Sequence, residues 1–160
     1  MATRRRGKAS KGRSVKRRVA KRPAARARKR GTVLSARKRS STDVRAFARR
    51  IIDVTRANDD AATLALYASD VESTEQGQPT TRGIDSIRQK FAGWRSMVTD
   101  ARFEPRRVCV DGNTIVIEWV GEVTLAASGK RAQLHEVAIH EIRDDKIARE
   151  AYFYDPASLR

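Results

Sequence analysis

The sequence predicts an α+β fold in which N-terminal helices pack in a curved antiparallel sheet, with a basic tail in front of the domain. Three observations lead to this prediction. The positive charge is concentrated in residues 1–41, apolar residues recur at helical spacing as far as about residue 98, and alternating segments typical of strands follow. An order in which helices come first and consecutive strands follow is typical of an α+β domain. We therefore divide the chain into a tail over 1–41 and a domain over 42–160.

The tail is very basic. It holds 18 Lys and Arg and no Asp or Glu, so the net charge of +16 divides into +18 for the tail and −2 for the domain. Such a segment cannot bury enough apolar surface to offset its ordering entropy, and we expect it to be disordered when free. Its charge predicts binding of nucleic acid or another polyanion, without sequence preference because no aromatic side chain is present to stack on bases. The clusters expected to make these contacts are Arg4, Arg5, Arg6, Lys16, Arg17, Arg18, Arg28, Lys29, Arg30, Arg37, Lys38 and Arg39.

The same tail has other interpretations. It could only solubilise the protein, or it could act as a transit peptide or as a nuclear import signal in a eukaryote. No apolar run is long enough to span a membrane, so no membrane contact is expected. The single cysteine, Cys109, cannot form an intrachain disulfide, which fits a reducing compartment. We expect a cytoplasmic protein, associated with the nucleoid if the tail binds DNA, or a nuclear one in a eukaryote.

Three helices are expected at the start of the domain. Ser40 and Asp43 have the spacing of a capping box, and apolar residues then recur at helical spacing until RANDD (56–60) breaks the pattern. A second helix over about 60–68 would include Tyr67, and a third is expected over 84–98. The polar, turn-rich segment between these two helices indicates a short strand and a loop. The side chains expected to face the core from the first helix are Val44, Phe47, Ala48, Ile51 and Ile52.

Four strands are expected after the helices. Their ranges are 102–111, 113–127, 132–142 and 147–155. Short turns at 128–130 and 143–146 join the last three as an antiparallel meander. A strongly curved sheet wrapped around the helices would leave a cone with an apolar interior.

Four stretches of the domain resemble the SnoaL-like branch of the nuclear-transport-factor-2-like superfamily, to which ketosteroid isomerases, polyketide cyclases and limonene epoxide hydrolases belong. They are LALYASDVEST (64–74), PTTRGIDSIRQKF (79–91), GNTIVIEWVGEVTLAASGK (112–130) and HEVAIHEIRDDKIAREAYFYDP (135–156). Their order and spacing are specific for the fold and not for an activity. The resemblance implies a homodimer whose cone binds a small apolar molecule.

The isomerase pattern matches this sequence in part. The resemblance implies that Glu75 takes the place of the carboxylate base, at the end of the first strand. The positions that would hold the oxyanion fall at about Ile51 and Ala138, which have no hydrogen-bond donor. Tyr67 retains a supporting tyrosine, whereas Phe91 replaces another. Steroid-isomerase chemistry is therefore not expected.

Strand alternation predicts which side chains line the cone. If Trp119 faces inward, so do Val123 and Leu125, and the next strand presents Leu134 and Ala138. We take Glu75 and His140 as candidate catalytic residues, because a carboxylate in an apolar cavity has a raised pKa and can act as a general base. A register slip of one residue would turn the whole set outward. The expected ligand-pocket residues are Tyr67, Phe91, Trp119, Val123, Glu136, Glu150, Tyr152 and Tyr154.

Three interpretations of the domain remain open. It could be a dimeric module that binds a small molecule, an enzyme of isomerase, cyclase or hydrolase type with Glu75 as general base, or a structural dimerisation module with a filled cone. Glu75 could also be a solvated loop acid, and His135 or His140 a surface or packed histidine. We expect no cofactor, and no metal site because Glu136 and His140 lack a suitably spaced third ligand.

Overall fold

The computed structural model describes residues 41–159. The basic clusters of the predicted tail and the cap residue Ser40 lie outside the described residues. Three helices and six strands confirm the predicted α+β class, and no described helix is long and apolar enough to cross a membrane. The elements are α1 (Ser41–Arg56), α2 (Asp60–Leu64), β1 (Tyr67–Glu75), β2 (Thr81–Arg82), α3 (Ile84–Met97), β3 (Val98–Asp111), β4 (Thr114–Leu125), β5 (Arg131–Arg143), β6 (Lys146–Tyr154) and the short 3-10 helix η1 (Pro156–Leu159).

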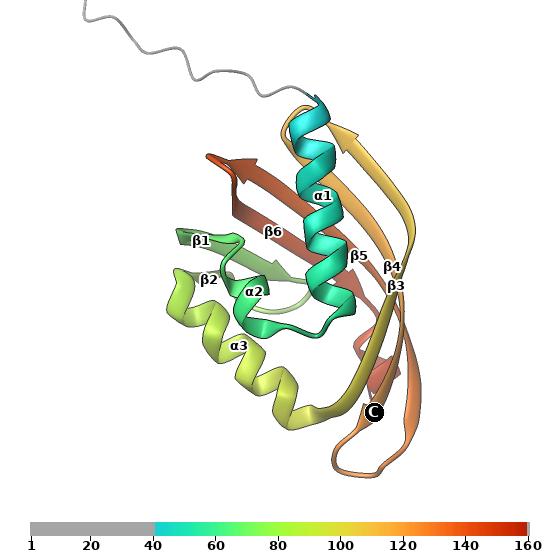
Figure 1. Ribbon diagram of the computed structural model, residues 1–160. Coiled ribbons are helices and arrows are strands. Elements are labelled where there is room, and N and C mark those ends of the chain that lie inside the picture. Colours follow the sequence, from blue (N-terminus) through green and yellow to red (C-terminus); the bar gives the residue numbers. More distant parts are fainter. Residues whose placement is uncertain (1–40, 160) are drawn as a thin grey trace, which may run out of the picture. The chain divides into compact units, whose positions relative to one another are not determined.

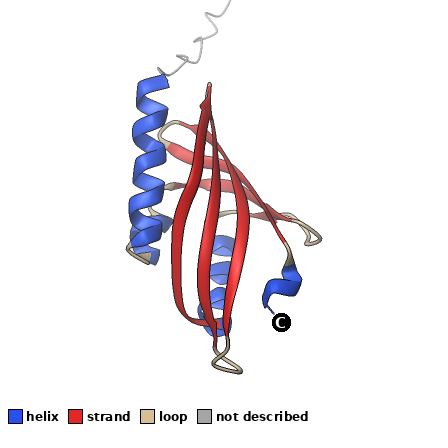
Figure 2. Ribbon diagram, turned by 90° about the vertical axis from the view of Figure 1, so that its right-hand side faces the viewer, coloured by secondary structure: helices blue, strands red, loops and turns tan. Residues whose placement is uncertain are grey.

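The six strands form one sheet in the order β2-β1-β6-β5-β4-β3. The four long strands from β3 to β6 make the predicted antiparallel meander, and β1 adds to it by pairing parallel with β6. Asp144 and Asp145 both have positive φ angles, 51° and 58°, which suit the tight turn between β5 and β6. Figures 1 and 2 show the sheet curving around α1 and α3, so its concave face is directed towards the helices.

The second helix is shorter than predicted. Asp59 caps it by accepting a hydrogen bond from the Ala62 amide at 2.9 Å, and the helix ends at Leu64. The expectation that it includes Tyr67 is wrong, because Tyr67 is the first residue of β1 and pairs with Ile147 of β6. The Ile147 amide also donates to the Leu66 carbonyl at 2.8 Å. This pairing involves residues 80 positions apart, which local periodicity does not reveal.

The core lies between α1 and the sheet. The apolar face predicted for α1 is buried, with Val44 and Phe47 exposed by 1 % and 2 %. Burial of each large apolar side chain of this face contributes about 1.5–3 kcal/mol relative to exposure. A second, smaller cluster lies farther along β4 and consists of Val98, Ala101, Val123 and Leu125.

Gly121 separates these two clusters on β4. A Cβ atom at this position would lie 2.5 Å from Cε1 of Phe103, so glycine is what allows the Phe103 ring to lie against the strand. The ring packs between Trp94 and Trp119, with centroid distances of 6.3 and 6.4 Å. Phe103 thereby closes one end of the space under the sheet.

Candidate functional site

A cavity of about 310 Å³ lies between the helices and the concave face of the sheet. Seven of the nine aromatic side chains of the chain line it, so its wall is mainly apolar. Because the cavity is present, the interior of the cone is not filled, and the interpretation as a structural module with a filled cone loses its basis. The aromatic residues of the wall are Tyr67, Phe91, Trp94, Phe103, Trp119, Tyr152 and Tyr154.

Most of the predicted pocket residues line this cavity, and two do not. Val123 is buried in the smaller cluster with Leu125, because the cavity ends where Phe103 crosses Gly121. Glu150 is 4 % exposed and lies behind the wall, where other side chains cover it. The residues predicted for the pocket or for catalysis that do line it are Tyr67, Glu75, Phe91, Trp119, Glu136, His140, Tyr152 and Tyr154.

Glu150 is the centre of a buried hydrogen-bond network. Its Oε2 accepts from the hydroxyls of Tyr67 at 2.7 Å and Tyr152 at 2.9 Å. Its Oε1 accepts from Ser73 Oγ at 2.6 Å and from Lys90 Nζ at 3.4 Å. Burial and the adjacent Glu150 carboxylate raise the pKa of both tyrosines well above the ordinary value, so both stay neutral donors. The network joins β1, β6 and α3 beneath the cavity.

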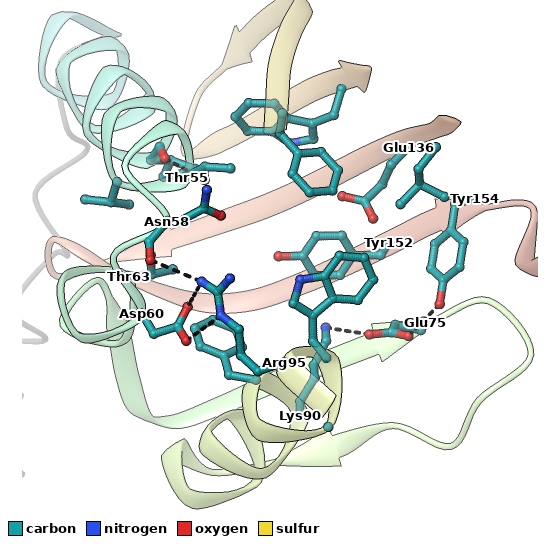
Figure 3. A pocket seen from close by; sticks show the side chains of 18 of the residues that line it. Thr55, Asn58, Asp60, Thr63, Glu75, Lys90, Arg95, Glu136, Tyr152 and Tyr154 are labelled. Carbon is teal, nitrogen blue, oxygen red and sulfur yellow. Dashed lines mark hydrogen bonds and ion pairs between the residues drawn. The ribbon is translucent and has the colours of Figure 1, made fainter. Parts of the chain in front are cut away.

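Glu75 is bound at the end of β1 and is not a solvated loop acid. Its side chain is 24 % exposed, and its Oε1 lies 2.8 Å from Lys90 Nζ. Tyr154 donates to Glu75 Oε2 at 3.1 Å, and burial together with the Glu75 charge raises the pKa of Tyr154 to about 12. The Lys90 ammonium also lies 4.1 Å from the ring centroid of Tyr152, a cation–π contact. Figure 3 shows Lys90 reaching from α3 to Glu75 and Tyr154 reaching it from β6.

Lys90 was not among the predicted site residues. A signal for it exists in the sequence, since position 90 lies three residues after Ile87 and four before Trp94, which places it on the inward face of the helix. Its charge makes it an unusual member of that face. Its two carboxylate partners explain its position, because a charge in a poorly solvated site needs such pairing.

Glu136 is the acid on the cavity wall that has no partner. It lies on β5, directly opposite Trp119 of β4 and Tyr154 of β6. Its carboxyl group makes no hydrogen bond or ion pair with any described residue. Burial raises its pKa from the ordinary 4.5 to about 7, with Lys90 opposing this effect and the charges of Glu75 and Glu150 adding to it. Figure 3 shows the carboxyl group pointing into the cavity.

The two histidines of β5 point to opposite faces of the sheet, as their odd spacing predicts. His135 is exposed, whereas His140 is 2 % exposed and contributes to the cavity wall. The Nδ1 atom of His140 has no hydrogen-bond partner among the described residues and lies 3.7 Å from Glu150 Oε2. Burial lowers the pKa of His140, so the ring is neutral at pH 7.

A second polar group, also absent from the predictions, lies on the helical side of the cavity. Arg95 of α3 donates from Nε and Nη2 to the Asp60 carboxylate at 2.9 and 2.7 Å, and from Nη2 to the Asn58 carbonyl at 3.1 Å. The hydrogen bonds to Asp60, together with the charge of that carboxylate, raise the pKa of Arg95. Figure 3 shows this pair across the cavity from Glu75 and Tyr154.

The arrangement provides acid–base groups and no metal-binding cluster. Within residues 41–159, no group of three or more His, Cys, Asp or Glu side chains is arranged to hold a metal ion. What the cavity offers a ligand is an aromatic wall, one unpaired carboxyl group and two paired cations. Such a site can bind a small molecule and exchange a proton with it.

Comparisons with known proteins place this geometry in a family. The sequence over residues 48–150 matches the model of the SnoaL-like domain family. A search of curated proteins found no match. Among solved structures, an NTF2-like protein of unknown function from Burkholderia pseudomallei aligns with a TM-score of 0.66 and 20 % identity over 76 % of this chain and 95 % of that one.

Two further structures come from proteins with named classes. A putative SnoaL-like polyketide cyclase from Jannaschia has a TM-score of 0.67 and 15 % identity, over 74 % of this chain and 89 % of that chain. An epoxide hydrolase of M. tuberculosis has a TM-score of 0.61 and 15 % identity, over 74 % and 86 % of the two chains. At these identities the likeness shows the fold alone. Because the family model matches more than half of the sequence, the chain belongs to the family of SnoaL-like domains.

Proposed function

We propose that the domain binds a small, mainly apolar molecule in the cavity and that Glu136 exchanges a proton with it. The observation that carries this proposal is the unpaired carboxyl group of Glu136 on a mainly apolar, aromatic-rich wall. A general acid or base is most effective when its pKa lies near the working pH, and the pKa of Glu136 is about 7. The open cavity supplies the space, and its apolar wall keeps this acid poorly solvated.

Glu75 is less available for the same role. Both of its oxygens are engaged, one by Lys90 and the other by Tyr154. Contacts of this kind occupy the carboxylate oxygens that would otherwise accept a proton from a ligand. We therefore assign Glu75 the task of holding Lys90 and Tyr154, and keep it as the alternative base.

The opening of 5-nitrobenzisoxazole tests the proposal without knowledge of the natural ligand. A base removes the proton on C3 while the N–O bond breaks, and the product is a coloured cyanophenolate. We expect the protein to accelerate this reaction with a rate that rises through a pH of about 7, and Glu136→Gln to lose at least about 100-fold of that rate. Phenolate absorbance measures both.

Two variants make this test specific. Glu122→Gln changes an exposed acid of β4 and should keep the full rate. Loss of the rate in Glu75→Gln, with Glu136→Gln unaffected, would identify Glu75 as the base. A protein no faster than acetate at equal concentration would show that proton exchange in this cavity is wrong.

We propose separately that residues 1–41 bind nucleic acid or another polyanion without sequence preference. Support comes from their 18 basic residues and the absence of any acid. Removing residues 1–40 should weaken binding to random-sequence DNA and flatten its dependence on salt, because each phosphate contact releases a counterion. Fluorescence anisotropy at two salt concentrations measures both quantities, and unchanged values would refute the proposal.

A homodimer would strengthen this binding. We propose that the domain pairs with a second copy, as the family resemblance implies, so that each particle carries two tails and gains avidity. The mass of the particle in solution, measured by light scattering, reports the dimer directly. DNA binding of this kind would place the protein at the nucleoid of a bacterium or in the nucleus of a eukaryote.

A further inference from the structure

The charges around the cavity are unequally paired. Both cations are already bound, Lys90 by Glu75 and Glu150, and Arg95 by Asp60. Acids outnumber cations by four to two, and Glu136 is the one left without a partner among these described residues. A ligand anion would find no free cation here, whereas a ligand cation would find a free carboxyl group.

Aromatic residues lie opposite Glu136 on both neighbouring strands. The β4–β5 register sets Trp119 opposite Glu136, and the β5–β6 register sets Tyr154 opposite it. Side chains opposed in this way have Cβ atoms about 4.5–5.5 Å apart, and all three line the cavity. Aromatic faces attract cations, most strongly where water is scarce. The row of Trp119, Glu136 and Tyr154 thus combines a carboxyl group with two π surfaces.

We propose that the ligand of this cavity is an organic cation, a protonated amine or a quaternary ammonium carried on an apolar group, with its charge at Glu136 between Trp119 and Tyr154. This inference rests on the proposed function in so far as the cavity is a binding site, and it names the group that meets Glu136. The apolar part of the ligand lies against the remaining aromatic wall. A carboxylate or phosphate in the same place would face three acids and only a lysine that is already paired.

The ionisation of Glu136 controls the affinity of the cavity for a cation, because the groups around it are either paired or neutral. The titratable groups that interact electrostatically with it are Lys90 from α3, Glu75 and Tyr67 from β1, and Glu150, Tyr152 and Tyr154 from β6. Lys90 pairs with the two acids, and burial raises the pKa of all three tyrosines, so the tyrosines remain neutral. A cation should therefore bind more tightly as pH rises and Glu136 ionises.

Four ligands that share a phenyl ring and differ in charge separate the effect of ligand charge on affinity from the effect of ligand shape. They are phenyltrimethylammonium, 2-phenylethylamine, 2-phenylethanol and phenylacetate, titrated into the full chain by calorimetry. Near pH 8 we expect both cations to bind at least about tenfold more tightly than phenylacetate. Between about pH 5.5 and 8 the affinity of phenyltrimethylammonium should rise roughly 30-fold, in proportion to the ionised fraction of Glu136.

The variants show whether Glu136 is responsible. Glu136→Gln should lose at least about tenfold in affinity for both cations, lose the pH dependence, and bind 2-phenylethanol as before. Glu122→Gln, which changes an exposed acid of β4, should behave as the wild type. The wild type and both variants carry the same basic tail, so any binding of phenylacetate to the tail cancels in the comparison.

The outcomes distinguish this inference from the proposed function. Phenyltrimethylammonium has no proton to exchange, so its binding in a protein that does not open benzisoxazole would support the cation site and overturn the proton exchange. Tighter binding of phenylacetate than of the cations would overturn the cation site and leave the cavity as a binding site. Failure of all four ligands to bind would contradict both.

Discussion

Replacing Glu150 with Ala is expected to lower the free energy of unfolding by about 3–5 kcal/mol. The substitution leaves buried hydroxyl donors without their acceptor and removes one of the two carboxylates that pair with a lysine. The hydroxyls of Tyr67, Tyr152 and Ser73 all donate to this carboxylate, and Lys90 pairs with it. The Glu150 side chain is fully buried, so water cannot replace it without opening the wall. Urea denaturation followed by tryptophan fluorescence measures the loss.

Two further variants separate the effect of breaking the hydrogen-bond network from the effect of removing a negative charge. Glu141→Ala removes an acid of β5 that pairs with Arg149 at the surface, and should cost at most about 1 kcal/mol. Glu150→Gln keeps one acceptor oxygen and the side-chain volume, so its cost should lie between the two alanine variants. A loss below about 1 kcal/mol for Glu150→Ala would show that the hydroxyls find other partners, and the network would not hold the cavity wall.

Glu136→Gln is expected to stabilise the domain at neutral and alkaline pH. In the folded protein the pKa of Glu136 is about 7, compared with an ordinary 4.5, so the native state retains a proton that the unfolded chain has released. The stability from this group is present below pH 4.5 and is lost as pH rises through 7. Glutamine cannot ionise, so the variant should gain up to about 3 kcal/mol over the wild type near pH 8.

The pH profile of this difference is the decisive measurement. Urea denaturation at a series of pH values should show wild type and Glu136→Gln converging near pH 4.5 and separating as pH rises to about 7. Glu122→Gln should show no such trend, since its side chain is exposed. A constant difference across this range would mean that Glu136 ionises freely in the cavity.

Much of the inner face of the sheet could be predicted from alternation alone. The inward positions of β5 follow from a step of two residues that holds from Arg131 to Glu141, before the register shifts at Ile142. Periodicity specifies a face but not a depth along it, which is why Val123 was expected in the pocket. It faces inward as predicted, yet Phe103 separates it from the cavity.

Other features depend on contacts between distant parts of the chain. Tyr67 belongs to a strand because β6 pairs with it, and the local sequence is equally compatible with a helix. Glu150 could be placed on the inward face, but the three hydroxyls that cover it come from β1 and from Tyr152 on its own strand. Lys90 acquires its role only when α3 lies against β1. The polar network was therefore harder to predict than the apolar scaffold.

Gly121 has a consequence for how this cavity can diversify. It does not line the cavity, yet the absence of its side chain gives the Phe103 ring the place from which it closes one end. Any larger residue at 121 would clash with that ring, whereas the atoms nearest to such a side chain include none from Glu75, Lys90 or Glu136. The packing at one end of the cavity and the charges on its wall are thus set by separate positions, so a substitution could change one of these properties without changing the other.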